Sequence, residues 1–153
     1  MKRIMLLLVM LSLQSCISVK ISNDKFDKKQ YENVRNTNLT ASGTYFENGN
    51  VDKDWSNQNS NNSTQASFRD ASGISFIKLK ANKNVSVQFH HLVKLEGKIK
   101  FEVINSKNEV VFERDLNNSI EENFNLELNS GEYVIRWEAK NANGFYFLEW
   151  KQK

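Results

Sequence analysis

Residues 85–96 read VSVQFHHLVKLE, and apolar and polar side chains alternate along this stretch. The apolar members of the alternation are Val85, Val87, Phe89, Val93 and Leu95. Between them stand Ser86, Gln88, His90, Lys94 and Glu96, and Leu92 is the one apolar residue on that side. Because successive side chains of a strand point to opposite faces, this period of two predicts a strand with one buried face and one solvated face.

The same alternation recurs in segments 99–103, 124–128 and 133–137. Turn residues separate the segments, namely Glu96-Gly97, Ser106-Lys107-Asn108, Asn117-Asn118-Ser119, Asn129-Ser130-Gly131 and Asn143-Gly144. Short strands with turns roughly every 8 to 12 residues are typical of sandwiches and barrels. The sequence therefore predicts an all-β fold, a single antiparallel β-sandwich of about seven to nine strands and of jelly-roll or Ig-like type. We expect the first strand at 40–46 and the last at 145–151.

Two longer stretches of the sequence resemble a known class of domain. They are VKLEGKIKFEVINSKNEVVFERDL (93–116) and LNSGEYVIRWEAKNANGFYFLEW (128–150). With these hairpins, residues 74–151 resemble the small β-sandwich domains of many secreted bacterial proteins. The resemblance implies the fold and assigns no catalytic residue, since unrelated functions share this architecture.

The amino-terminal residues predict export. Lys2 and Arg3 precede an apolar stretch, 4–11, which is the pattern of a secretory signal peptide. The stretch is too short to span a bilayer, which needs roughly 20 apolar residues. The run Leu13-Gln14-Ser15-Cys16 resembles the lipobox of bacterial lipoprotein precursors. That resemblance implies cleavage before Cys16 and acylation of its sulfur and new amino group; the alternative is an ordinary signal peptide in which Cys16 falls by chance.

These signals divide the chain into a signal peptide (1–15), a lipidated cysteine with a flexible tether (16–38) and a β-sandwich domain (39–153). Two acyl chains suffice for stable anchoring, since each buried CH₂ contributes about 0.8 kcal/mol and a single chain is marginal. Ile17, rather than an aspartate, follows the cysteine, so resemblance to Gram-negative lipoproteins implies the outer membrane. We therefore expect the protein in the cell envelope, anchored to a membrane by lipid.

Charge and cysteine content exclude two classes of protein. Loss of residues 1–15 removes Lys2 and Arg3 and leaves 19 basic residues against 18 acidic ones. Because nucleic-acid binding needs a clustered basic face, no nucleic-acid partner is expected. Cys16 is the only cysteine, so no disulfide can form within the domain, whose stability must come from a hydrophobic core.

The two histidines, His90 and His91, are adjacent. Neighbours in a strand point to opposite faces, so regular β geometry does not let both bind one metal ion. By parity His91 shares the apolar face and is predicted to be partly buried, whereas His90 is predicted to be solvated. The alternative gives His91 a role as a pH-sensitive or ligand-contacting group.

Residues 47–64 are rich in Asn and Ser and predict a long loop. Within it, oxygen-bearing side chains occupy every second position, at Asn50, Asp52, Asp54 and Ser56, as in calcium loops. The match is poor, because Trp55 stands where an EF-hand has glycine. A solvated loop without metal is therefore the prediction, and calcium at Asn50, Asp52 and Asp54 is the weaker alternative.

Aromatic residues gather near this loop and in the last hairpin. The candidates for ligand contact, together with His91, are Tyr45, Trp55, Trp137, Phe145 and Phe147. In the final strand Phe145 and Phe147 oppose Tyr146, Leu148 and Trp150. Either this strand is central and covered on both sides, or one aromatic set forms a binding surface for a sugar or a protein.

Catalytic and cofactor motifs are missing from the sequence: it has no Gly-x-Ser-x-Gly turn, no His-Glu-x-x-His and no Gly-rich phosphate loop. We therefore expect no enzyme activity and no cofactor. The predicted function is that of a membrane-anchored binding or accessory module, with a glycan or an envelope protein as partner. The alternative is a structural component of the cell envelope that assembles through strand addition at a sheet edge.

Overall fold

The structure is a computed structural model that describes residues 30, 31, 33–50 and 56–153, without the side chains of 44–50, 56 and 57. In this part of the chain all regular structure is β. The strands are β1 Leu39–Asn50, β2 Ser56–Asn59, β3 Ser63–Ala81, β4 Val85–Asn105, β5 Val110–Leu116, β6 Ile120–Leu128 and β7 Gly131–Gln152. The described residues include no helix able to cross a membrane.

All strand pairs are antiparallel, in the order β1-β3-β7-β4-β5, with β2 also on β3 and β6 also on β4. The predicted antiparallel sandwich is confirmed. Fewer separate strands occur than the maximum predicted, because three of them are very long: β3 has 19 residues, β4 has 21 and β7 has 22. Strands β4 and β7 each contain two of the predicted short strands, 85–96 with 99–103 and 133–137 with 145–151, joined by a bend.

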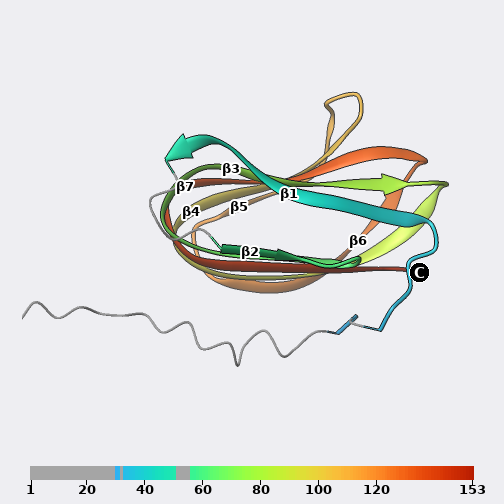
Figure 1. The fold of residues 1–153 in the computed structure, drawn as a ribbon, viewed down its shortest axis with the longest axis horizontal. Coiled ribbons are helices and arrows are strands. Elements are labelled where there is room, and N and C mark those ends of the chain that lie inside the picture. The colour runs from blue at the N-terminus through green and yellow to red at the C-terminus, as the bar shows by residue number, and fades with distance from the viewer. Residues whose placement is uncertain (1–29, 32, 51–55) are drawn as a thin grey trace, which may run out of the picture.

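The sheet is folded over on itself. Its upper layer in Figure 1 contains β1, β5 and segments 73–81, 98–105 and 131–139 of the three long strands. The lower layer contains β2, β6 and segments 63–68, 85–95 and 144–152 of the same strands. The long strands pass from one layer to the other at one side of the molecule (Figure 1). Strand β7 lies between β3 and β4 in both layers.

Irregular residues make the bend. The pairing register shifts between Phe68 and Gly73 in β3 and at Gly97 in β4. A Cβ on Gly97 would lie 2.3 Å from the Asn141 carbonyl oxygen, and one on Gly144 would lie 1.9 Å from the Lys94 oxygen. Both glycines also have positive φ, 100° and 137°, which residues with side chains rarely adopt. Strands β4 and β7 therefore approach so closely that only glycine fits at these positions.

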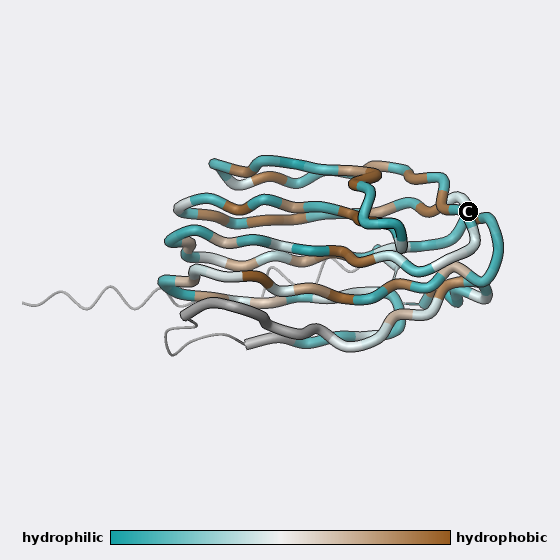
Figure 2. Tube along the Cα trace, turned by 90° about the horizontal axis from the view of Figure 1, so that it is seen from above, coloured by the Kyte–Doolittle hydropathy of each residue, from teal (hydrophilic) through white to brown (hydrophobic). Residues whose placement is uncertain are grey.

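The core lies between the layers and is filled by every second residue of each strand, as the alternating colours along the strands in Figure 2 indicate. Its largest fully buried side chains are Trp137, Trp150, Tyr146, Phe89 and Phe101. A second, smaller apolar cluster consists of Leu92, Phe145 and Phe147. Since Phe145 and Phe147 alternate with Tyr146, Leu148 and Trp150 along β7, this cluster lies on the face of the lower layer turned away from the core.

Residues before β1 also pack on the sandwich. Tyr31 is 5% exposed, and its backbone N–H donates to the buried Glu149. Asn36 accepts from the Gln152 N–H, at 2.7 Å, and donates to the Trp150 oxygen, at 3.3 Å. The sequence assigned 16–38 to a flexible tether; residues 30, 31 and 33–38 are instead held against the lower layer.

The prediction of a long loop at 47–64 is also wrong in part. Strands occupy 47–50, 56–59 and 63–64 of that range, and residues 51–55 lie outside the described part of the chain. The Asn and Ser side chains gave no apolar alternation from which these strands could be recognised. Backbone pairing with the long strand β3 provides their hydrogen bonds instead.

Candidate functional site

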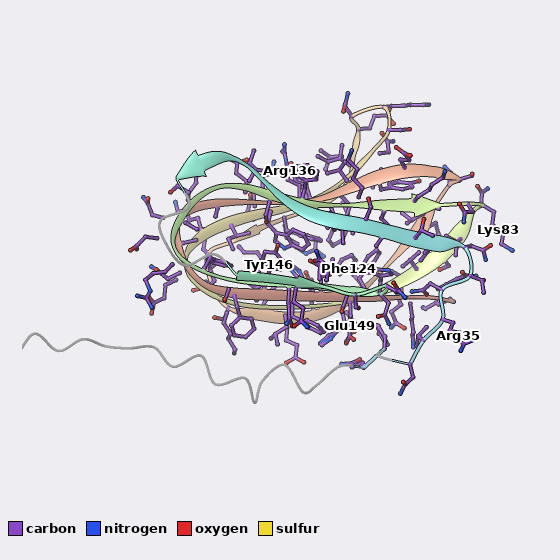
Figure 3. All side chains as sticks on the ribbon, in the orientation of Figure 1. Arg35, Lys83, Phe124, Arg136, Tyr146 and Glu149 are labelled. Atoms are coloured by element: carbon purple, nitrogen blue, oxygen red, sulfur yellow. The ribbon has the colours of Figure 1, made fainter. Side chains whose placement is uncertain are left out.

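A polar pocket of about 410 Å³ lies where the segment before β1 meets the turn between β2 and β3. Residues that line it include Asn33, Arg35, Ser60, Asn61, Asn62 and Glu149. Arg35 and Glu149 are labelled in Figure 3, at the lower layer. The volume falls within the range of roughly 300 to 1,000 Å³ that small-ligand sites occupy.

The β2–β3 turn is held by its own side chains. The Ser60 backbone N–H donates to the Ser63 oxygen at 2.8 Å, and the two hydroxyls of these residues lie 2.7 Å apart. Asn62 is 6% exposed; its carbonyl accepts from the Trp150 N–H at 2.9 Å, and its side-chain amide donates to the Tyr31 oxygen. The turn is therefore fixed both to β7 and to the segment that forms the opposite wall of the pocket.

Glu149 connects that segment to the sandwich. Its carboxylate is 1% exposed. One oxygen accepts from the Gln30 N–H at 2.9 Å and lies 2.8 Å from His90 Nδ1; the other accepts from the Tyr31 N–H at 3.0 Å. The remaining ring nitrogen of His90 lies 3.2 Å from a Glu121 oxygen. Since carboxylates only accept, the ring donates to both only when each of its nitrogens carries a proton.

His90 is therefore not solvated, contrary to the prediction. Its parity is as expected, because it faces away from the core, but its side chain is fully buried. Phe147 packs against it edge-on, with centroids 6.3 Å apart, and Glu149, which also binds Gln30, lies 2.8 Å from its Nδ1. Parity predicts which face a residue occupies and says nothing of what covers that face.

His91 lies in the core and is fully buried, not partly as predicted. The Trp137 indole N–H donates to His91 Nε2 at 3.3 Å, and His91 Nδ1 lies 3.7 Å from a Glu122 oxygen. Burial lowers the pKa of His91, an effect that outweighs the opposing influence of Glu122. The nearby His91 ring, with help from Arg114, lowers the pKa of Glu122 despite burial.

The aromatic candidates form no exposed patch among the described side chains. Trp137 is 1% exposed in the core, and Phe145 and Phe147 are 4% and 2% exposed in the small outer cluster. Strand β7 is thus central and covered on both sides, the first of the two alternatives above. The predicted ligand contacts of these three residues and of His91 are not available in this conformation. Trp55 and the side chain of Tyr45 lie outside the described residues.

The metal candidates Asp52, Asp54 and the side chain of Asn50 likewise lie outside the described residues. Within the described ranges, no group of three or more His, Cys, Asp or Glu side chains is arranged to hold a metal ion. Glu121 and Glu149 contact opposite nitrogens of His90, so these three do not converge on one point.

The outer face of the upper layer carries a network of paired charges. Glu102, 2% exposed, is bonded to Arg136 and lies 2.8 Å from Lys100 Nζ. Burial alone would raise the pKa of Glu102, but the two cations outweigh it and hold the pKa below its usual range. Because the charges of this network are paired with one another, it is a weaker candidate for ligand binding than the pocket.

The sequence did not predict the pocket. Its residues come from positions 33–35, 60–63 and 149, and none of them forms a recognised motif. The run of Asn and Ser at 56–63 was the only signal, and it was assigned to a loop. Only the folded sheet brings the three parts together.

No family model and no curated protein matches this chain. Solved structures with a similar arrangement of strands include the following three. The secreted serine protease VesC from Vibrio cholerae has a TM-score of 0.48 and 16% identity over 76% of this chain and 25% of its own. Tailspike protein 4 of bacteriophage CBA120 has a TM-score of 0.42 and 8% identity over 76% and 20%. A family 29 carbohydrate-binding module mutant, complexed with mannohexaose, has a TM-score of 0.39 and 18% identity over 78% and 93%.

This chain thus spans about a quarter of VesC and a fifth of the tailspike domain. All three TM-scores are below 0.5. These likenesses concern the general arrangement of strands and carry no conclusion about what this chain binds.

Proposed function

We propose that this chain is a lipid-anchored, extracytoplasmic domain that binds a glycan, without catalysis, in the pocket between residues 33–35 and the β2–β3 turn. The observation that carries the proposal is the polar lining of a cavity of about 410 Å³. Asn33, Asn61 and Ser60 supply side-chain amides and a hydroxyl, which both donate and accept hydrogen bonds. Such groups match the hydroxyls of a sugar.

The charges of the lining favour a neutral ligand. Arg35 and Glu149 have opposite charges and line the same pocket. The buried carboxylate disfavours an anionic ligand and the guanidinium disfavours a cationic one, whereas sugar hydroxyls can accept from the exposed guanidinium. A glycan therefore suits this site better than a phosphate or an amine.

Glu149 supports the non-catalytic part of the proposal. A general acid or base must exchange a proton with a reacting group within hydrogen-bond reach. Both oxygens of Glu149 are already engaged, by Gln30, Tyr31 and His90. The carboxylate of the pocket is thus committed to structure.

Assembly by strand addition is the weaker function. Strand β5 ends the order of the upper layer, and its Glu113, Arg114 and Asp115 are exposed. Charged residues on an edge strand oppose pairing with another chain. Exposed large hydrophobic residues are confined, among the described residues, to Val110 and Val111, at 47% and 43% exposure.

The proposed anchor rests on the lipobox-like residues ending at Cys16. Together with Ile17 they favour the outer membrane of a Gram-negative envelope. Intact-mass analysis of the membrane fraction tests this. We expect the wild-type protein to begin at Cys16 and to carry acyl groups, and Cys16→Ser to lose membrane association. A wild-type mass without acyl groups contradicts the anchor.

A glycan array probed with the purified full-length protein tests the pocket. We expect Arg35→Ala to reduce the strongest signals and Lys83→Ala to leave them unchanged. Lys83 is the matched control, because it is an exposed cation in the turn after β3, labelled in Figure 3. Trp55→Ala adds a test of the predicted loop contact. Wild-type protein that binds no glycan contradicts the proposed function, and equal loss in Arg35→Ala and Lys83→Ala contradicts the pocket.

A further inference from the structure

The two walls of the pocket have different origins. Ser60, Asn61 and Asn62 belong to the turn of a β-hairpin, whereas Asn33 and Arg35 belong to the segment before β1. That segment is not part of the sheet, and it stays in place only through contacts with the sandwich. The pocket is therefore complete only when the segment is docked.

Glu149 makes the central contact between the segment before β1 and the sandwich. Its carboxylate accepts two consecutive backbone N–H groups, those of Gln30 and Tyr31, at 2.9 and 3.0 Å. Hydrogen bonds to an ionised acceptor are roughly twice as strong as those between neutral groups. Asn62 holds the same segment from the opposite side, through the Tyr31 oxygen.

Burial makes undocking costly. Glu149 is 1% exposed, and its third partner, His90, is fully buried. If the segment left, the carboxylate would lose two of its three donors and keep only His90, and a buried charge that loses partners is destabilised. A residue that served only the stability of the sandwich would take its donors from the sheet, yet two of the three donors to Glu149 come from the segment.

We infer that Glu149 is a positioning residue, which seats residues 30, 31 and 33–35 and thereby builds one wall of the pocket. Docking of the segment and assembly of the binding site are then one equilibrium. By thermodynamic reciprocity, a ligand that contacts both walls stabilises docking as much as docking improves binding. The identity of that ligand rests on the proposed function, but the docking itself does not.

Hydrogen exchange at the Gln30 and Tyr31 amides tests the inference on the full-length protein without any ligand. The variant is Glu149→Gln, whose side-chain nitrogen donates, so one of the two backbone N–H groups loses its acceptor. Because a hydrogen bond to a charged group is worth about 1.5 to 3 kcal/mol, we expect exchange at these amides to accelerate at least tenfold. Trypsin cleavage after the exposed Arg35 should accelerate in parallel.

Glu138→Gln is the matched control, since it removes the same charge from the same strand in the other layer. We expect it to leave both readouts unchanged. Exchange at the fully buried Phe89 reports whether Glu149→Gln still folds. Should that variant unfold, Asn36→Ala replaces it, because Asn36 lies in the segment itself and its loss breaks the contacts with Trp150 and Gln152.

The outcomes separate the inference from the proposed function. Faster exchange at Gln30 and Tyr31 with a protected Phe89 supports the inference, and unchanged exchange overturns it. On the glycan array, Glu149→Gln should lose the signals that Glu138→Gln retains. A wild-type protein that binds no glycan but shows the expected exchange would refute the proposed function alone.

Discussion

Trp137 lies flat against Tyr146, with ring centroids 4.1 Å apart and ring planes 2° apart. Both residues belong to β7, but Trp137 is in the upper layer and Tyr146 in the lower one. The stack forms because the strand bends between them, so that two aromatic rings of one strand meet across the core. The Tyr146 hydroxyl lies 3.1 Å from the Ser75 hydroxyl, which satisfies its buried oxygen.

We expect Trp137→Ala to lower the free energy of unfolding by about 3 to 5 kcal/mol, because it removes a fully buried ring and leaves a cavity. Urea denaturation followed by circular dichroism measures the change. Tyr146→Phe is the control: it keeps the ring stack and loses one hydrogen bond, for about 1 kcal/mol. Equal losses in the two variants would show that the stack does not stabilise the fold as described.

Gly97→Ala and Gly144→Ala should each destabilise the bend. Backbone strain at positive φ costs of order 1 to 3 kcal/mol. In addition, the new methyl groups would lie 2.3 and 1.9 Å from carbonyl oxygens of the neighbouring strand. Thermal unfolding should therefore show a clear fall in midpoint for both variants.

Gly131→Ala separates the effect of backbone strain at positive φ from the effect of a steric clash of the new methyl group. Gly131 has φ 154°, yet a Cβ there would meet nothing within 4 Å. We expect its thermal midpoint to fall less than those of the two bend variants. If all three fall equally, close approach of β4 and β7 is not what requires glycine.

The protein should lose stability on mild acidification through His91. Burial holds the pKa of this ring below its ordinary value of about 6.5. Below that pH the unfolded chain takes up a proton that the folded protein refuses, so stability falls as the pH drops and levels off once the folded ring is protonated. The slope is at most about 1.4 kcal/mol per pH unit for one group.

Urea denaturation of wild type and His91→Gln between pH 7.5 and 5.5 measures this effect. The glutamine retains an acceptor for the Trp137 indole but does not titrate. Subtracting the two curves isolates His91 from the groups that both proteins share. An identical pH dependence in the two proteins would contradict the assignment. Below pH 4.5 the lowered pKa values of Glu102 and Glu122 predict a further loss of stability as these carboxylates protonate.

The charges on β5 should keep the protein from self-association. Replacing Arg114 and Asp115 by Val would extend the apolar run that begins at Val110 along a free edge. We expect this double variant to form concentration-dependent oligomers in size-exclusion chromatography with light scattering. The control replaces Lys78 and Lys80 by Val, which adds the same apolar residues to β3, a strand paired on both sides in the upper layer. Oligomers in both variants would point to general hydrophobicity instead of the edge.

The sequence predicted those features that depend on local alternation. The period of two in 85–96 identified a strand and the faces of His90 and His91, and the Gly turns marked the bends. It did not predict that the bends at Gly97 and Gly144 join segments of one strand, because a turn between strands of one layer and a bend between layers carry the same residues.

The candidate site was less predictable for a related reason. Asn33, Asn61 and Glu149 are ordinary polar residues in sequence, and the first and the last, which line the same pocket, are separated by most of the domain. His90 contacts Glu149 and Phe147 of the last strand, and no alternation within β4 reports these contacts. Pairing of distant segments, and not local pattern, decides both features.

The central place of β7 has a consequence for biogenesis. Strands β3 and β4 both pair with it and not with each other, so until residues 131–152 arrive, β1 to β3 and β4 to β6 are two separate groups of strands. A growing chain cannot close this core while the residues of β7 are still within the exit tunnel of the ribosome. Loss of β7 by premature termination would therefore leave two groups of strands that do not pair with each other, and not a shortened domain.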